Sequence, residues 1–332
     1  MAERWSPDHL RLHRLLLSRP ALLPKGSPLL LAVSGGQDSM ALLALLGDLC
    51  RLHHWSLALW HGDHRWRADS AQQASELADW AREQDLPLTI DVWSEPEPGE
   101  AAARDWRYQR LTHQAQRLGA QRVVTGHTAS DRAETLLLQL ARGSHRRGLR
   151  GPQALRPLAG ELQLARPLLG FSRADTSRLC RELDLPVWLD ASNANPAFAR
   201  NRIRLEVLPV LEQLHPGASG RICALSERLA EEEEAMADLT DLALEGLIRA
   251  APVPAGGLNR QTLMALKPAA QRRLLQRWLE RTGGPALTAR QLEELRGQLE
   301  PQRGPGRRSL AGGQVLHWDR QRLWLAEAEQ LL

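Results

Sequence analysis

The apolar positions of the first two hundred residues follow two periods, one typical of strands and one typical of helices. Short apolar runs favour strands, and the longer segments between them repeat apolar residues at helical spacing. Strands are expected at residues 29–34, 56–61, 88–93 and 121–127, and helices at residues 7–18, 40–53, 70–84, 99–118, 129–142 and 172–185. This alternation predicts an α/β fold with a parallel, doubly wound sheet. Ligands bind such sheets at the C-terminal ends of strands, so the turns after Val33, Trp60 and Val124 should line one crevice.

The pattern changes near His215-Pro216-Gly217, where strand-like runs give way to helical spacing. Residues 221–250 fit one long helix whose run of four Glu residues suits a solvated face. Residues 259–300 suggest two more helices, residues 302–314 a loop, and residues 314–326 a hairpin turning at Asp319-Arg320. We therefore expect a first domain over residues 1–215, a linking helix over 216–250 and a smaller, mainly helical C-terminal domain over 251–332.

Composition and charge narrow the class of protein. The chain has 332 residues, 43% hydrophobic and 25% charged, as is typical of a globular protein, and its formal net charge is +4. This mild basic excess is compatible with an RNA or nucleotide partner. Cys50, Cys180 and Cys223 have no metal-ligand spacing and form no disulfide framework, which fits a reducing cytoplasm. No signal pattern is expected at the N-terminus, and no apolar run approaches the roughly 20 residues of a membrane span.

The turn between the first strand and its helix carries the first candidate chemistry. Residues 34–39 read S-G-G-Q-D-S. Two glycines allow close backbone approach, and two hydroxyls meet the N-terminus of a helix, a combination that suits a phosphate. The lysine of a Walker A loop is missing. Because a carboxylate repels a phosphate, Asp38 makes sense beside one if Mg²⁺ lies between them. The alternative is an ordinary strand-to-helix turn with Asp38 matched to the helix dipole.

Polar residues gather at the other strand ends and in two loops. They are His61, Asp63 and His64; His127, Asp131 and Glu134; the loop arginines Arg142, Arg146, Arg147 and Arg150; and Asp190, Ser192, Asn193, Arg200, Asn201 and Arg204. Each group also has a structural explanation. A histidine at a strand end is commonly packed or capping, an arginine-rich loop is commonly solvated, and two acids three residues apart suit a helix N-terminus.

Taken together, the motifs resemble a known family. The S-G-G-Q-D-S turn resembles the S-G-G-x-D-S loop of the N-type ATP pyrophosphatases, the PP-loop superfamily with a Rossmann-like fold. Within that superfamily the chain resembles the tRNA(Ile)-lysidine synthetases. The resemblance rests on this turn followed, in order, by D-H, R-Y, GHTASDRAET, RGSHRRGL, RPLL and D-x-S-N…R-N-x-I-R. The resemblance covers roughly residues 29 to 215. The C-terminal part is similar in size and helical character alone.

The resemblance implies a reaction in the cytoplasm on isoleucine tRNA with a CAU anticodon. ATP would adenylate the C2 carbonyl oxygen of the wobble cytidine, and the ε-amine of free L-lysine would then attack C2 and expel AMP to give lysidine. It implies an ATP loop of Ser34, Gly35, Gly36, Gln37, Asp38 and Ser39, with Mg²⁺ at Asp38. The implied catalytic residues are Asp38, Asp131, Glu134, Arg107 and Arg204, with Asp131 and Glu134 beside the lysine ammonium. The candidates for tRNA binding are Arg142, Arg146, Arg147, Arg150 and Arg200, together with the C-terminal domain.

Two departures from the family pattern bear on this site. Ser130 precedes Asp131 where the family commonly has a second Asp, so metal contact would rest on Asp38, Asp131 and water if that Asp binds metal. His145 replaces a glycine of the arginine-rich loop and adds a group able to stack on a base or face a phosphate. Asp63 and His64 fall on the family's D-H pair, and the sequence gives them no physical role.

Two other functions compete with this interpretation. A cytidine thiolase of the same superfamily usually needs catalytic cysteines or an iron–sulfur cluster at C-x-x-C spacing, which the three cysteines do not provide. A nucleotide-binding regulatory module would not need so many polar motifs at strand ends. Amidotransferase-type members need a glutaminase, and no region of the chain fits one.

Overall fold

We describe the fold from a computed structural model covering residues 5–66, 68–97, 99–144, 146–188, 198–249 and 257–327. Asp190, Ser192, Asn193 and His145 lie outside the described residues, as do the side chains of Arg146 and Arg147. The chain forms two compact units, unit 1 (Met1–Ala230) and unit 2 (Glu231–Leu332). The division falls within helix α10 (Ala218–Arg249), which contains most of the expected linking helix.

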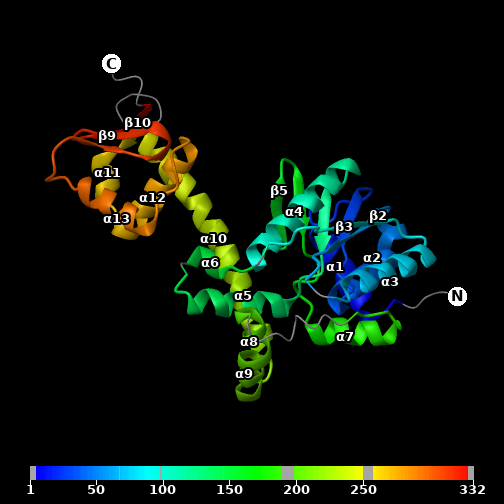
Figure 1. The fold of residues 1–332 in the computed structure, drawn as a ribbon. Coiled ribbons are helices and arrows are strands. Elements are labelled where there is room, and N and C mark those ends of the chain that lie inside the picture. The colour runs from blue at the N-terminus through cyan, green and yellow to red at the C-terminus, as the bar shows by residue number, and fades with distance from the viewer. Residues whose placement is uncertain are drawn as a thin grey trace. The chain divides into compact units, whose positions relative to one another are not determined.

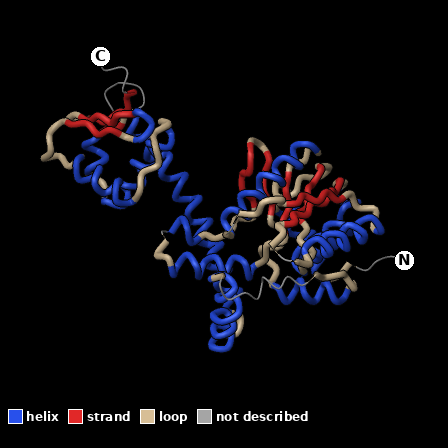
Figure 2. The backbone as a smooth tube through the Cα atoms, in the orientation of Figure 1, coloured by secondary structure: helices blue, strands red, loops and turns tan. Residues whose placement is uncertain are grey.

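Unit 1 is built on a six-stranded sheet with the order β3-β2-β1-β4-β6-β5 (Figures 1 and 2). The strands are β1 (Pro28–Ala32), β2 (Ser56–Asp63), β3 (Leu88–Val92), β4 (Arg122–Thr125), β5 (Leu155–Ala159) and β6 (Leu162–Ala165). All neighbours pair in parallel except β5 and β6, which form an antiparallel hairpin at one edge. The predicted parallel α/β sheet is confirmed, and the edge hairpin is an addition that the sequence analysis did not expect.

Unit 1 also contains helices within the described residues. They are α1 (Pro7–Ser18), α2 (Gln37–His53), α3 (Ser70–Glu83), α4 (Glu100–Arg117), α5 (Ala129–Ala141), α6 (Arg146–Leu149), α7 (Arg173–Glu182), α8 (Ala199–Arg202) and α9 (Leu208–Leu214), with a π-helical turn, η2 (Ile203–Val207), between the last two. Ser6 caps α1 through a capping box with His9, and Pro7 occupies the first turn, so the helix begins where the predicted helix over residues 7–18 does.

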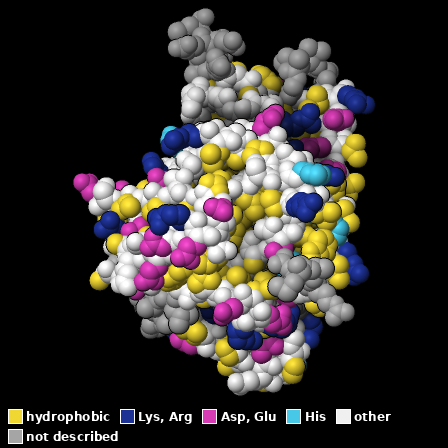
Figure 3. All heavy atoms as spheres, turned by 90° about the vertical axis from the view of Figure 1, so that its right-hand side faces the viewer, with side chains coloured by type: hydrophobic (Ala, Val, Ile, Leu, Met, Phe, Trp, Pro, Cys, Tyr) yellow, Lys and Arg dark blue, Asp and Glu magenta, His cyan; other side chains and the backbone are white. Residues whose placement is uncertain are grey.

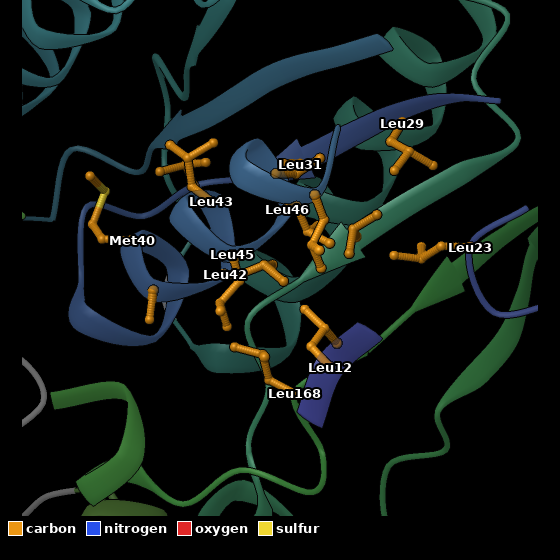
Figure 4. Packing of buried hydrophobic residues seen from close by; sticks show 14 of the residues in the cluster. Leu12, Leu23, Leu29, Leu31, Met40, Leu42, Leu43, Leu45, Leu46 and Leu168 are labelled. Carbon is orange, nitrogen blue, oxygen red and sulfur yellow. The ribbon is translucent and has the colours of Figure 1, made fainter. Parts of the chain in front are cut away.

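The core of unit 1 follows from the alternation of side chains along the central strand. Leu29 and Leu31 of β1 belong to a cluster with residues of α1, α2, α3 and α7, whereas Leu30 belongs to a second cluster with residues of α4. Figure 4 shows side chains of β1 and α2 gathered with Leu12 and Leu168 in the first cluster. Because β1 is buried on both faces, its sequence is apolar throughout, as expected for a central parallel strand.

Unit 2 packs helices on an antiparallel sheet with the order β7-β10-β9-β8. Its elements are β7 (Leu258–Asn259), α11 (Arg260–Met264), α12 (Pro268–Arg281), α13 (Ala289–Gln298), β8 (Gly306–Ser309), a 3-10 turn η3 (Ala311–Gly313), β9 (Gln314–Trp318) and β10 (Arg322–Glu327). The predicted hairpin is confirmed, and its turn is held by N–H groups of Gln321 and Arg322 that donate to Asp319 Oδ1. The predicted loop over 302–314 is wrong, because it contains β8. No helix in the described ranges is long and apolar enough to cross a membrane.

The buried Arg260 organises unit 2. Its guanidinium donates to the backbone carbonyls of Leu299 (3.0 Å), Asp319 (2.6 Å), Glu300 (2.8 Å) and Arg303 (2.5 Å), so it joins the end of α13 to the β9–β10 turn. Loss of this side chain would remove the donor from all four carbonyls, and leaving a buried carbonyl such as that of Leu299 unsatisfied costs about 1–3 kcal/mol.

We expect Arg260→Met to lower the free energy of unfolding of unit 2 by about 3 kcal/mol or more, because Met keeps the apolar stem and removes every donor. The matched control is Arg290→Met in the same unit. Arg290 is 90% exposed and pairs with Glu294 across one turn of α13, which is worth less than about 0.5 kcal/mol. Chemical denaturation followed by circular dichroism measures the free energy of unfolding of both variants. Equal destabilisation by the two variants would contradict this role for Arg260.

Candidate active site

The S-G-G-Q-D-S loop connects β1 to α2 and is held by its own hydroxyls. The Ser34 N–H donates to Ser39 Oγ (3.2 Å), and the Gly36 N–H donates to Ser34 Oγ (3.3 Å). Gly35 adopts a left-handed conformation (φ +80°), and a Cβ atom there would lie 3.0 Å from the Trp188 ring. Gly36 offers no side-chain cap to α2, so the N-terminus of this helix is open to an anion.

Asp38 lies in the first turn of α2 and is fixed by α7. Its Oδ1 accepts a hydrogen bond from the Thr176 hydroxyl (2.5 Å), and its Oδ2 lies 3.8 Å from the Arg173 guanidinium. Burial raises the pKa of the Asp38 carboxyl, the partners on α7 offset this only in part, and the negative charge of Asp131 raises it further. A cation at Asp38 would relieve both effects, and a carboxylate among hydroxyl and phosphate oxygens is a donor set that suits Mg²⁺.

A close backbone contact brings the end of β4 against the start of α2. A Cβ atom at Gly126 would lie 2.7 Å from the carbonyl oxygen of Asp38 and 3.0 Å from the backbone nitrogen of Ser39. No side chain fits at this distance, so only glycine allows the approach. On the other side of β1, the Nδ1 atom of His61 lies 2.8 Å from the Val33 carbonyl oxygen. The turns after β1, β2 and β4 therefore lie together, as the sequence analysis predicted.

The next turn brings an acidic pair to the same place. Thr128 and Asp131 form a capping box at the start of α5, in which the Thr128 N–H donates to Asp131 Oδ2 (2.7 Å). Desolvation lowers the pKa of His127 to about 3, so its ring is neutral at pH 7. Burial opposes ionisation of Asp131, but the neighbouring His127 ring, then the Arg200 guanidinium and the hydrogen bonds from Thr128, hold the pKa of this carboxyl below its ordinary value.

Glu134 is fully buried, and two arginines pair with it. Arg204 donates through Nε to Glu134 Oε1 (2.5 Å) and through an Nη atom to Oε2 (2.8 Å). Arg200 bridges the two acids, donating to Glu134 Oε2 (2.7 Å) and to Asp131 Oδ1 (2.6 Å). We call these four side chains the ion cluster. Two carboxylates and two guanidiniums make it neutral in sum.

The arginines of the ion cluster come from α8 and the π-helical turn that follows it. Arg200 lies on α8 and Arg204 within η2. A π-turn inserts an additional residue into a helix and is frequently found at functional sites. Here the segment directs both guanidiniums toward α5. The resemblance implied catalytic roles for Asp131, Glu134 and Arg204 and a tRNA contact for Arg200. The structure instead pairs both arginines with the two acids.

The remaining predicted residues lie around this centre. The Arg107 guanidinium lies 3.3 Å from His64 Nε2, at the end of β2. Asp63 is buried and accepts from the Arg65 N–H (2.9 Å), so it shapes the turn after β2. Arg142 is exposed at the end of α5, Arg150 is half-buried, and Arg146 begins α6. Thr176 and Trp188 contact the S-G-G-Q-D-S loop, which we call the phosphate loop. They were not predicted as site residues, because no local motif marks them.

Comparison with known proteins agrees with this geometry. Residues 10–211 match the model of the PP-loop domain, and residues 258–324 match the model of the TilS substrate binding domain. Unit 1 is therefore a PP-loop domain, the class defined by its parallel sheet and its phosphate loop. The U34-tRNA thiolase NcsA from Methanococcus maripaludis, described with its [4Fe-4S] cluster, has a similar fold. The TM-score is 0.57 at 16% identity, covering 68% of this chain and 78% of that one.

More similar sequences define the family within this class. The chain is 53% identical to the tRNA(Ile)-lysidine synthase of Parasynechococcus marenigrum (strain WH8102), over 96% of this chain and 94% of that protein. It is 47% identical to the tRNA(Ile)-lysidine synthase of Synechococcus sp. (strain ATCC 27144 / PCC 6301 / SAUG 1402/1), over 88% of each. The chain belongs to the tRNA(Ile)-lysidine synthase family.

We expect Gly126→Ala to weaken ATP binding, because the added methyl group would push β4 away from the first turn of α2 and open the phosphate loop. The matched control is Gly47→Ala in the same helix, where an added Cβ atom meets nothing within 4 Å. That change should stabilise the protein by about 0.4–1 kcal/mol and leave ATP binding unchanged. Calorimetric titration with ATP compares the ATP affinity of the two variants with that of the wild type. Wild-type affinity in a folded Gly126→Ala protein would rule out this constraint.

Proposed function

We propose that the protein ligates lysine to C2 of the wobble cytidine of an isoleucine tRNA with a CAU anticodon. In the first step the C2 oxygen of cytidine attacks the α-phosphorus of ATP, and pyrophosphate leaves. In the second step the ε-amine of lysine forms a bond to C2 and loses a proton, and the C2–O bond breaks to release AMP. The observation that carries the proposal is the placement of the ion cluster beside the phosphate loop, so close that the charge of Asp131 acts on Asp38.

The phosphate loop is suited to the first step. Backbone N–H groups of the loop and α2 would bind the pyrophosphate portion of ATP, and the hydroxyls of Ser34 and Ser39 lie among them. Asp38, which Thr176 orients, would hold Mg²⁺ beside the phosphate loop. Mg²⁺, when bound, neutralises charge on the phosphate oxygens.

The ion cluster is suited to the second step once the lysine ammonium has replaced one of its two guanidiniums. A neutral cluster has no net charge to attract the lysine ammonium, so a guanidinium must leave before the ammonium can pair with Asp131. Arg200 is the candidate. Its side chain is 33% exposed against 18% for Arg204, and it makes a single hydrogen bond to each acid, whereas Arg204 binds both oxygens of Glu134.

This exchange also supplies a base. Paired with Arg200, Asp131 has a lowered pKa and is a poor proton acceptor. Departure of the guanidinium lets the ammonium pair directly with Asp131, so this carboxylate is in place to accept the proton that the amine has to lose. The released Arg200 is then free to meet negative charge on a phosphate.

Binding of tRNA would depend on local arginine clusters. In the view of Figure 3, Lys and Arg side chains lie among Asp and Glu side chains, in keeping with the formal net charge of +4. We assign phosphate contacts to the loop arginines Arg142, Arg146, Arg147 and Arg150, and further contacts to unit 2, which carries Arg303 and Arg307.

The cysteines do not favour the thiolase alternative. Burial raises the pKa of the Cys180 thiol to about 11 and also raises the pKa of Cys50 and Cys223, so none is an activated nucleophile. Within the described residues, His, Cys, Asp and Glu form no group of three that could hold a metal.

The ATP step is tested with Asp38→Asn. Asparagine keeps the shape and the acceptor for Thr176 and removes the charge, so the variant should fold. Release of pyrophosphate dependent on isoleucine tRNA should fall by on the order of 100-fold or more. Wild-type protein assayed with methionine tRNA should release no pyrophosphate. Normal turnover by Asp38→Asn would sink the assignment of this carboxylate to the nucleotide.

The lysine step is tested with Asp131→Asn, which keeps an acceptor for the Thr128 cap. The apparent KM for lysine should rise by a factor of about 10 to 150, the equivalent of one lost hydrogen bond between charged groups, while the apparent KM for ATP stays unchanged. This variant is preferable to Glu134→Gln, because removing a fully buried charge destabilises the fold by about 3–5 kcal/mol. Equal increases in both constants would show that Asp131 serves the nucleotide.

A further inference from the structure

An aromatic cluster lies at the C-terminal ends of β2 and β3, outside the ion cluster. The rings of Trp93 and Trp106 are stacked, with centroids 5.3 Å apart and planes 7° apart. The His64 ring meets the Trp106 ring at 4.8 Å and the Trp66 ring at 5.6 Å. We call His64, Trp66, Trp93 and Trp106 the aromatic platform. Trp66, at its margin, is 42% exposed.

Several contacts hold this platform in place. Trp60 lies beneath Trp106, with ring centroids 6.1 Å apart, and its indole N–H donates to Asp91 Oδ2 (2.7 Å). A Cβ atom at Gly62 would lie 2.5 Å from the Trp60 ring and 2.9 Å from the Trp106 ring, so glycine is required between them. The buried Asp63 fixes the loop that carries Trp66. These contacts tie Trp106 to the sheet and fix the turn that precedes Trp66.

The surroundings of the platform are basic. The Arg107 guanidinium lies 3.3 Å from His64 Nε2, and the half-exposed Arg65 pairs with Asp63 at 3.0 Å. Exposed aromatic rings beside arginines are the usual means by which proteins hold unpaired nucleobases, because every base has a π-face and a neighbouring phosphate. Strand β2 is the neighbour of β1, so the platform lies next to the phosphate loop along the same edge of the sheet.

We propose that the aromatic platform stacks a base of the anticodon loop beside the wobble cytidine, with Trp66 as the ring that receives it. This proposal rests on the proposed function and adds a recognition site to it. A cytidine that enters the crevice must leave its stack, and its neighbour then needs a new stacking partner. Trp66 is the exposed ring of the platform, while Trp93 and Trp106 pack behind it against His64. Asp63 and His64 gain roles in this arrangement, as supports of Trp66.

The test measures binding of an anticodon stem-loop of isoleucine tRNA to Trp66→Leu, Trp66→Phe and wild type. Loss of one stacked base should weaken binding by Trp66→Leu roughly 5- to 150-fold, and Trp66→Phe should recover most of it. The salt dependence should not change, since stacking releases no counterions. The matched control is Trp5→Leu, a tryptophan of unit 1 that contacts His13 beside α1 and should leave RNA binding unchanged.

A fluorescent base locates the contact. Stem-loops that carry 2-aminopurine on either side of the cytidine should show quenching by wild type at one position, and that quenching should be lost with Trp66→Leu. Wild-type RNA affinity and quenching in Trp66→Leu would overturn the proposal. Weaker ATP binding by Trp66→Leu without RNA would also overturn it, because the platform would then hold the adenine of ATP. Lysine transfer by the wild type is measured in parallel, so that failure of the proposed function is seen separately.

Discussion

The buried carboxylate of Glu134 is the constraint on which the site depends. A charge with no exposure to water is tolerated only when opposite charges and hydrogen bonds surround it. Arg200 and Arg204 supply both, from positions 66 and 70 residues further along the chain. The ion cluster therefore fixes α8 and η2 against α5. The charges of the ion cluster balance, which is why we propose that a cationic amine binds there only when Arg200 moves away.

The order of the strands in the sheet places the ion cluster beside the phosphate loop. The turns after β1, β2 and β4 meet at one edge because those strands are adjacent and parallel. Gly126 allows the last turn to approach α2 within atomic contact, and Thr176 of α7 orients Asp38 from the other side. Neighbouring strands thus supply the parts of the site. The phosphate loop follows β1, the acidic pair follows β4, and the aromatic platform lies at the ends of β2 and β3. One edge of the sheet supplies the parts for an ATP-dependent reaction on a base.

Much of this arrangement could be predicted from the sequence, because it depends on local pattern. The apolar runs of β1 to β4, the cap at Ser6 and the glycines of the phosphate loop all act within a few residues. The predictions were wrong or incomplete where a residue or strand interacts with a partner far away in the sequence. Arg200 and Arg204 have the composition of a phosphate site, and nothing local distinguishes a phosphate partner from Glu134. The strand β8 carries two arginines and little apolar alternation, and it forms because β9 pairs with it.

The aromatic platform shows the same limit. Trp66, Trp93 and Trp106 come from three separate segments, and only the fold shows that they share a surface with His64. A tryptophan in a sequence is as consistent with a buried core as with a stacking surface. The distinction depends on exposure, and exposure depends on tertiary structure.

The activity proposed for this site is the joining of lysine to a tRNA base. The most direct measurement is incubation of the protein with ATP, Mg²⁺, labelled lysine and an isoleucine tRNA transcript, followed by nucleoside analysis. The account predicts that the label appears in one modified cytidine and that one AMP is formed for each lysine transferred. Formation of AMP and pyrophosphate with no label in the tRNA, or label at another nucleoside, would contradict it.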